Sequence, residues 1–198
     1  MRRTPLFFLA ALMLLGLGYG AYTLGRLAAK PELGGTALQN PVDVREVTLT
    51  GADGRTVTFG DFEGETVLVF FGYTRCPDVC PVTLARLAKL YHDAGEPTGL
   101  KIVMVTVDPA NDTPEVAQQY AASFQPDFVG LGGSNAQIAA AAKTFFVGLG
   151  ANGEPIAHTD AVFLVDRQGE FRTVYSQANL EALAADLASL GGRPRKPG

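Results

Sequence analysis

Hydrophobic residues follow two different patterns along this chain. Residues Pro5–Gly25 form an almost unbroken apolar run that contains no Asp, Glu, Lys or Arg. From Val42 to Leu190, shorter apolar runs alternate with polar and glycine-rich segments. A run of about 20 apolar residues is long enough to cross a bilayer as a helix, whereas alternating short runs are typical of a folded domain. The pattern therefore predicts a membrane-spanning segment followed by one domain.

The flanks of the long apolar run predict its orientation. Two arginines directly follow the initiator methionine, and positive residues resist translocation, so the N-terminus is expected in the cytoplasm. The apolar core of a cleaved signal peptide is usually shorter, on the order of 7 to 15 residues. Residues 1–30 are interpreted as a cytoplasmic N-terminus and a transmembrane signal anchor, with cleavage near Ala28 or Ala29 as the alternative. The folded domain is then expected on the non-cytoplasmic side of the cell membrane, periplasmic or extracellular, after a linker at residues 31–41.

Strands are expected where apolar runs are short and rich in Val and Phe. Val42–Thr50 alternates, and turn-forming residues separate it from Arg55–Phe59, which predicts a hairpin. The continuous runs Thr66–Tyr73 and Leu100–Val107 are typical of strands buried on both faces of a sheet. Three further strands are expected, the last two as a second hairpin: Phe128–Leu131, Ala161–Asp166 and Glu170–Tyr175.

Helices are expected between the strands. Pro81–Tyr91 carries apolar residues at helical spacing. A second helix is expected to begin with Asp112 as its N-cap and Glu115 as the acid of a capping box. Two more helices are predicted, at Asn135–Lys143 and from the second hairpin through Leu190. A strand, a helix and a strand in this order imply a right-handed parallel crossover.

The order of these elements predicts an α/β, thioredoxin-like fold with an N-terminal β-hairpin extension. The domain is expected at residues 42–190, followed by a flexible tail at 191–198. Of the 198 residues, 47% are hydrophobic and 18% are charged, which excludes a disordered chain. The formal net charge is −4 and no basic stripe is present, so a nucleic-acid partner is excluded.

The two cysteines, Cys76 and Cys80, are separated by only three residues. A disulfide this local closes almost no loop, so stabilisation is the weaker explanation for the pair. The pair lies where a predicted strand passes into a helix, and positions four apart on a helix share one face. Free amides and the positive dipole end at a helix start lower the pKa of a thiol. These features predict a site for a soft metal ion or for disulfide exchange.

The sequence Phe70–Pro81 resembles the Sco/SenC family, whose motif is an apolar strand, Gly-(Tyr/Phe)-Thr and then Cys-Pro-x-x-Cys-Pro. The resemblance continues through Val105–Pro114 and reaches His158, where the family has its metal-binding histidine. It implies a protein that binds one copper ion, Cu(I) or Cu(II), through Cys76, Cys80 and His158. It also implies a role in assembling the binuclear copper centre of cytochrome c oxidase. The implied partners are the copper-bearing oxidase subunit, a copper donor and a thiol reductant outside the cytoplasm.

The chemistry of these three side chains suits copper. Thiolates are soft ligands that favour Cu(I), and imidazole accepts both oxidation states, with zinc as the rival metal. The segment Val147–His158 is rich in glycine, which would let the histidine move toward or away from the sulfurs. If the two cysteines were oxidised to a disulfide, they could not bind the metal.

Simpler explanations exist for individual residues. A single histidine, whether His158 or His92, is more often a surface or hydrogen-bonded residue than a metal ligand. Asp108 and Asp112 are explained by a strand-end turn and a helix N-cap, so neither is assigned to the site.

Three functions remain open on the sequence. The favoured one is a metallochaperone, which binds and transfers copper without turnover. The alternative is a membrane-anchored thiol-disulfide oxidoreductase that acts on cysteines of the oxidase or of copper proteins, although such enzymes normally have two residues between their cysteines. A redox sensor that reports copper would use the same residues.

Overall fold

The computed structural model describes residues 13–20, 33–149 and 160–189. The chain divides into two compact units, Met1–Glu32 and Leu33–Gly198.

Only part of the predicted membrane segment is described. Residues 13–20 are helical, and the rest of Pro5–Gly25 lies outside the described residues. Of the helices that the structure describes, none combines the length and apolar character needed to cross a membrane.

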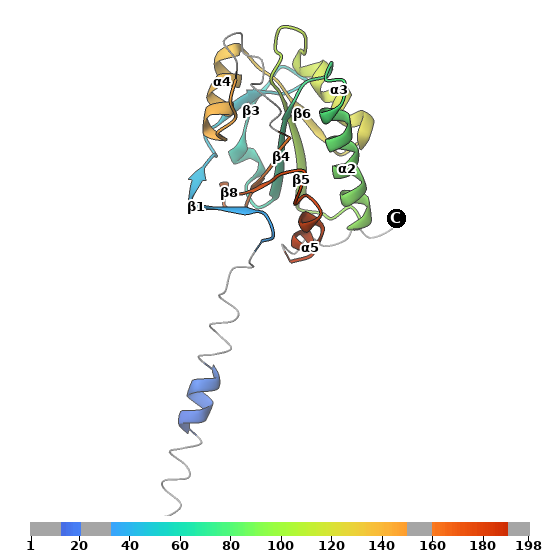
Figure 1. The fold of residues 1–198 in the computed structure, drawn as a ribbon. Coiled ribbons are helices and arrows are strands. Elements are labelled where there is room, and N and C mark those ends of the chain that lie inside the picture. Colours follow the sequence, from blue (N-terminus) through green and yellow to red (C-terminus); the bar gives the residue numbers. More distant parts are fainter. Residues whose placement is uncertain (1–12, 21–32, 150–159, 190–198) are drawn as a thin grey trace, which may run out of the picture. The chain divides into compact units, whose positions relative to one another are not determined.

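The second unit is built on a six-stranded sheet with the order β1-β8-β7-β4-β5-β6 (Figure 1). β4, β5 and β6 are parallel to one another. β7 pairs antiparallel with β4, β8 with β7, and β1 with β8, while β2 and β3 form a separate hairpin. The strands are β1 Thr36–Asp43, β2 Thr48–Thr50, β3 Thr56–Thr58, β4 Thr66–Gly72, β5 Leu100–Thr106, β6 Val129–Leu131, β7 Val162–Val165 and β8 Glu170–Tyr175.

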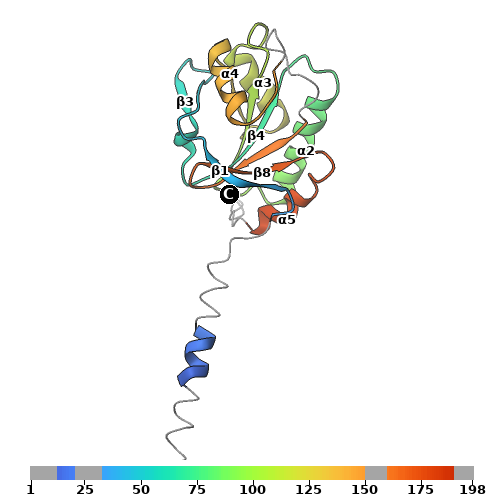
Figure 2. The same ribbon diagram turned by 60° about the vertical axis from the view of Figure 1, so that its left-hand side comes forward.

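Helices cover both faces of this sheet (Figure 2). Side chains of α2, α3 and α5 share one hydrophobic core, and those of α4 and the β2-β3 hairpin share the other. Along β4, Leu68 and Phe70 enter the first core, whereas Val69 and Phe71 enter the second. This burial on both faces explains why β4 reads as an uninterrupted apolar run. The helices are α2 Val79–Asp93, α3 Pro114–Phe124, α4 Asn135–Thr144, α5 Ala182–Ser189 and the short 3-10 helix η1 Phe59–Phe62.

Most expected elements are confirmed within one or two residues, but the start of the domain differs. Residues 36–41, assigned to a linker, belong to β1, which carries no alternating apolar pattern because it is an edge strand joined to β8 by backbone pairing. The strand expected at Val42–Thr50 is confirmed only at its end, Thr48–Thr50, which forms β2 and pairs with β3 as the expected hairpin; before it, the chain turns at Val44. There the Val44 N–H donates to the Gly169 carbonyl at 3.0 Å, and the Val47 N–H donates back to the Val44 carbonyl at 2.9 Å.

Candidate functional site

The cysteine pair lies where β4 passes into α2. β4 ends at Gly72, whose carbonyl accepts a hydrogen bond from the Val107 N–H at 2.9 Å, just beyond the end of β5. Cys80 is the second residue of α2 and is buried, whereas Cys76 lies in the preceding loop and is half-buried. Both cysteines are free thiols.

The two sulfurs are brought together by the loop rather than by a shared helix face. The Cys80 N–H donates a hydrogen bond to the Cys76 Sγ at 3.4 Å. Asp78 is the N-cap of α2 but its side chain makes no capping hydrogen bond, so the Cys76 sulfur satisfies an amide at the helix start. The structure thus brings the two cysteines into contact at the start of α2, but through the loop rather than through positions four apart on one helix face.

The two thiols have different acidities. Burial alone would raise the pKa of Cys76, but hydrogen bonds from the Cys80 side chain and from the Asp78 and Cys80 amides outweigh it and lower this pKa. Burial, followed by the hydrogen bond to Cys76, raises the pKa of Cys80 to about 12. The expectation that the helix start favours both thiolates is thus wrong for Cys80, because desolvation dominates at its buried sulfur.

Gly72 keeps the space beside the buried sulfur free. A Cβ atom at this position would lie 2.6 Å from the Phe70 ring and 3.1 Å from the Cys80 Sγ. A side chain there would displace one of the two, so glycine is required by close approach rather than by a turn. Gly72 is one of the motif residues to which the sequence alone assigned no physical role.

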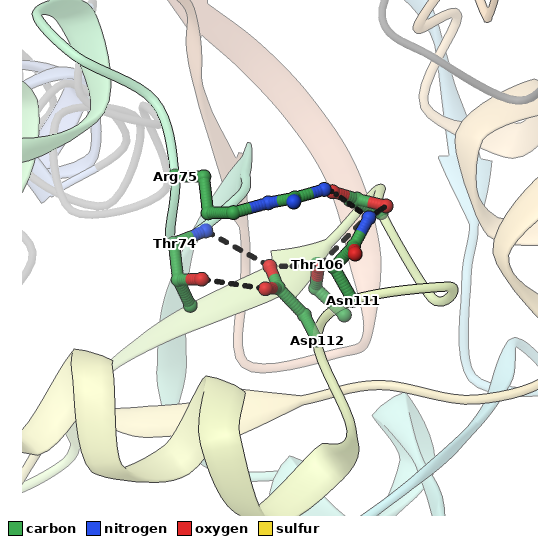
Figure 3. Close-up of polar contacts among 6 residues, drawn as sticks. Thr74, Arg75, Thr106, Asn111 and Asp112 are labelled. Atoms are coloured by element: carbon green, nitrogen blue, oxygen red, sulfur yellow. Dashed lines mark hydrogen bonds and ion pairs between the residues drawn. The ribbon is translucent and has the colours of Figure 1, made fainter.

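Asp112 was missed as a site residue. The N-cap of α3 is Thr113, whose side chain accepts from the Val116 N–H, and Glu115 forms no capping box. The Asp112 carboxylate instead accepts hydrogen bonds from Thr74 and Thr106 (Figure 3). It thereby contacts the cysteine loop, residues 73–78 between β4 and α2. The sequence could have indicated this, because Thr113-Pro114 already supplies the N-cap and the first residue of the helix. The preceding Asp112 is then not needed to start the helix.

His158 lies outside the described residues, so its position relative to the sulfurs is not described. Within residues 13–20, 33–149 and 160–189, no group of three or more His, Cys, Asp or Glu could hold a metal ion. The described chain resumes at Asp160, immediately before β7. Val162 of β7 pairs with Phe70 of β4, two residues before β4 ends at Gly72 and the chain enters the loop that carries Cys76.

Gln177 connects Asp160 to α2, the helix that carries Cys80. Its Nε2 donates to the Thr83 Oγ1 at 2.6 Å and to the Asp160 carbonyl at 3.3 Å. Its Oε1 accepts from the Arg86 Nη1 at 2.5 Å. Thr83 and Arg86 belong to the first half of α2, so the chain at Asp160 is joined to the same helix that carries Cys80.

The remaining candidates behave as their simpler explanations predict. His92 lies in the last turn of α2, at the end away from the cysteines, with its Nδ1 3.5 Å from the Glu96 carboxylate. Asp108 forms a turn after β5, in which its carbonyl accepts from the Asp112 N–H at 2.8 Å. Its carboxylate contacts Arg75 and Asn111 at the surface.

Comparison with known proteins gives consistent matches over this domain. The SCO1/SenC family model matches residues 37–191. The mitochondrial SCO2 homologue of Bos taurus is 31% identical over 83% of this chain and 67% of its own length. The matched stretches cover between 31% and 67% of the length of the curated relatives.

Solved structures show the same fold. Apo Sco1 from Thermus thermophilus is 38% identical, with a TM-score of 0.68 over 83% of this chain and all of that one. Copper-bound ScoI from Bradyrhizobium japonicum is 32% identical, with a TM-score of 0.62 over 77% of this chain and 98% of that one. BsSco, described with a disulfide switch as a member of the Sco family of cytochrome c oxidase assembly proteins, is 25% identical, with a TM-score of 0.63 over 77% and 96% of the two chains. The chain therefore belongs to the SCO1/SenC family and has its thioredoxin-like fold.

Proposed function

We propose that this protein is a metallochaperone that binds one copper ion through Cys76, Cys80 and His158 and helps assemble the binuclear copper centre of cytochrome c oxidase. The observation that carries the proposal is the pair of free thiols in mutual contact at the start of α2. Membership of the SCO1/SenC family adds support, because the family includes a copper-bound structure and a member described as an oxidase assembly protein.

The chemistry of the pair suits a soft ion that can be taken up and released. Two thiolates are the donors that Cu(I) prefers. Cys76 is half-exposed and its lowered pKa favours a thiolate that can meet an incoming ion. Cys80 holds its proton at neutral pH because its pKa is raised to about 12, so binding at its sulfur releases that proton. Metal binding is therefore expected to weaken as the pH falls.

Topology supports His158 as the third ligand. Val162, two residues after Asp160, pairs with Phe70, two residues before the end of β4, and Gln177 joins the Asp160 carbonyl to α2. His158 is two residues before Asp160, and two extended residues span at most about 7 Å. A histidine in that position is within reach of a loop that begins at the end of the same strand.

A second function is supported by the same contact. Two thiols that touch can close into a disulfide, and the related BsSco is described with a disulfide switch. The chain could then act as a thiol-disulfide oxidoreductase on cysteines of the oxidase or of copper proteins. Reductase chemistry needs only the two sulfurs, whereas tight copper binding needs the imidazole as well, so the role of His158 separates the two functions.

The experiment that tests the proposal is an anaerobic copper titration of the reduced full-length protein. Cu(I) is followed with a competing chelator and Cu(II) by its sulfur-to-copper charge-transfer absorption. The expected result is saturation at about one copper per chain in both states, with thiolate ligation in the spectra. A reduced protein that does not bind copper in either state would overturn the proposal.

Oxidation is expected to abolish copper loading. Diamide removes two electrons and two protons from the thiols, forming an S–S bond and a hydrazine, and the disulfide has no thiolate left to offer. The measurement is bound copper per chain after oxidation and removal of reagent, with re-reduction as the control that restores it. Stoichiometry that is the same before and after complete oxidation would contradict this expectation.

We also propose that residues 1–30 anchor the protein in the cell membrane as a single span, with the folded domain on the non-cytoplasmic side. The apolar run Pro5–Gly25 and the arginines before it support this topology. The protein is expected to stay in the membrane pellet after alkaline carbonate extraction. In spheroplasts, added protease should digest the folded domain, and protection of that domain until lysis would exclude this orientation.

A further inference from the structure

Asp112 is a buried carboxylate whose side-chain hydrogen bonds reach two other segments of the chain. Its side chain belongs to a residue that is only 1% exposed. The Thr74 N–H donates to Oδ2 at 2.8 Å, and the Thr74 hydroxyl donates to Oδ1 at 2.5 Å. The Thr106 hydroxyl also donates to Oδ2, at 2.8 Å. Figure 3 shows the carboxylate between the two threonines.

These hydrogen bonds join the cysteine loop to the neighbouring strand. Thr74 lies two residues after the end of β4 and two residues before Cys76, while Thr106 is the last residue of β5. Hydrogen bonds to an ionised acceptor are stronger than neutral ones, and removing the acceptor leaves the donors unsatisfied. Asp112 thus binds the loop through both the backbone N–H and the side-chain hydroxyl of Thr74.

The anchor point is itself held in place. The Asp112 N–H donates to the Asp108 carbonyl at 2.8 Å, and the Asp108 N–H donates to the Thr106 Oγ1 at 3.1 Å. The loop has a second connection at the surface, where Arg75 pairs with Asp108 at 3.1 Å, but the Arg75 side chain is 64% exposed. Exposed ion pairs contribute little, so the buried carboxylate is the stronger of the two connections.

We propose that Asp112 is a positioning residue for the cysteine pair: by holding Thr74, it fixes where Cys76 stands relative to Cys80. No hydrogen bond is described between the carboxylate and either sulfur, although, besides burial, its negative charge also contributes to the raised pKa of Cys80. The carboxylate sets how readily the two sulfurs act together, either in closing a disulfide or in binding one metal ion. The proposal deepens the proposed function, since it concerns the same pair, but its first readout needs no copper.

The test measures the effective concentration of the two thiols in the full-length protein. Reduced protein is equilibrated with mixtures of reduced and oxidised glutathione; each disulfide formed in the protein consumes one oxidised glutathione and yields two reduced ones. Asp112→Ala is expected to lower the equilibrium constant at least about tenfold, which is about 30 mV for this two-electron couple. Asp112→Asn keeps the shape and one acceptor oxygen, so a smaller decrease, about threefold, is expected.

Hydrogen exchange provides an independent check on the same variants. The Thr74 amide should exchange faster in Asp112→Ala than in the parent protein, because its acceptor has been removed. Thr74→Ser keeps both donors and should leave the glutathione equilibrium unchanged. Thr74→Val removes only the hydroxyl and should lower the equilibrium about threefold, so it decides the question if Asp112→Ala does not fold.

Asp186 offers a matched control. It is also a buried carboxylate, 6% exposed, and accepts hydrogen bonds from the Tyr175 hydroxyl at 2.7 Å and the Gly34 N–H at 2.8 Å. Asp186→Ala should lower the melting temperature but leave the glutathione equilibrium within twofold. An equilibrium within twofold of the parent in both Asp112→Ala and Thr74→Val, or an equal shift in Asp186→Ala, would overturn the positioning role.

A copper titration of the same variants separates this proposal from the proposed function. If the parent protein binds no copper but Asp112→Ala still shifts the glutathione equilibrium, the metallochaperone function fails and the positioning role stands. If the parent protein binds copper and the Asp112 and Thr74 variants match it in both measurements, the positioning role fails and the function stands.

Discussion

His158→Ala is expected to weaken copper binding by at least about 100-fold while leaving the fold and both thiols intact. Loss of a residue that only supports a ligand typically costs 10- to 100-fold in metal affinity, and loss of a ligand itself should cost more. The effect should be largest for Cu(II), because Cu(I) depends more on the two soft thiolates and less on the imidazole. The measurement is the anaerobic titration in both oxidation states, with circular dichroism to verify folding.

His92→Ala is the matched control for this experiment. His92 is the other histidine of the chain, its side chain is 79% exposed, and it lies 12 positions after Cys80 on α2, about 18 Å along the helix. Its removal should leave copper affinity unchanged. If His158→Ala and His92→Ala bind copper equally tightly, the three-ligand site is wrong and the oxidoreductase becomes the better explanation.

Iodoacetamide is expected to modify Cys76 at least about tenfold faster than Cys80 near neutral pH. Hydrogen bonds lower the pKa of Cys76, whereas burial raises the pKa of Cys80 to about 12, so Cys76 has the much larger thiolate fraction. The more acidic thiolate is also the weaker nucleophile, but this loss offsets only about half of the gain in thiolate on a logarithmic scale. Burial of the Cys80 sulfur, in a residue 4% exposed, should widen the difference further.

Peptide mass spectrometry of a time course measures the two rates separately. As the pH rises, the rate at Cys76 should level off first, whereas the rate at Cys80 should continue to increase because its thiolate fraction is still growing. Labelling in guanidinium chloride is the control, since unfolding removes both environments and should make the two rates similar. Equal rates in the folded protein would show that the sulfurs do not differ as the structure describes.

Expectations from the sequence succeeded where burial leaves a pattern along the chain. β4 and β5 are buried between two cores, so their apolar runs predicted them within one or two residues. α4 was predicted from Asn135 and begins there, where Ser134 and Gln137 form a capping box that depends only on neighbouring residues. β1 was missed because an edge strand held by backbone hydrogen bonds places few constraints on its side chains.

The sequence by itself determined the family, the strand-to-helix position of the cysteines and the choice of a soft-metal or redox chemistry, because these depend on residue type and short spacing. Tertiary structure alone decided that Cys80 is buried with a raised pKa while Cys76 caps the helix with its sulfur. It alone also showed that Asp112 holds the cysteine loop through Thr74, although 38 positions separate the two residues in the sequence. Desolvation and hydrogen bonds between distant segments depend on which surfaces meet after folding, and no local pattern of residues encodes that meeting.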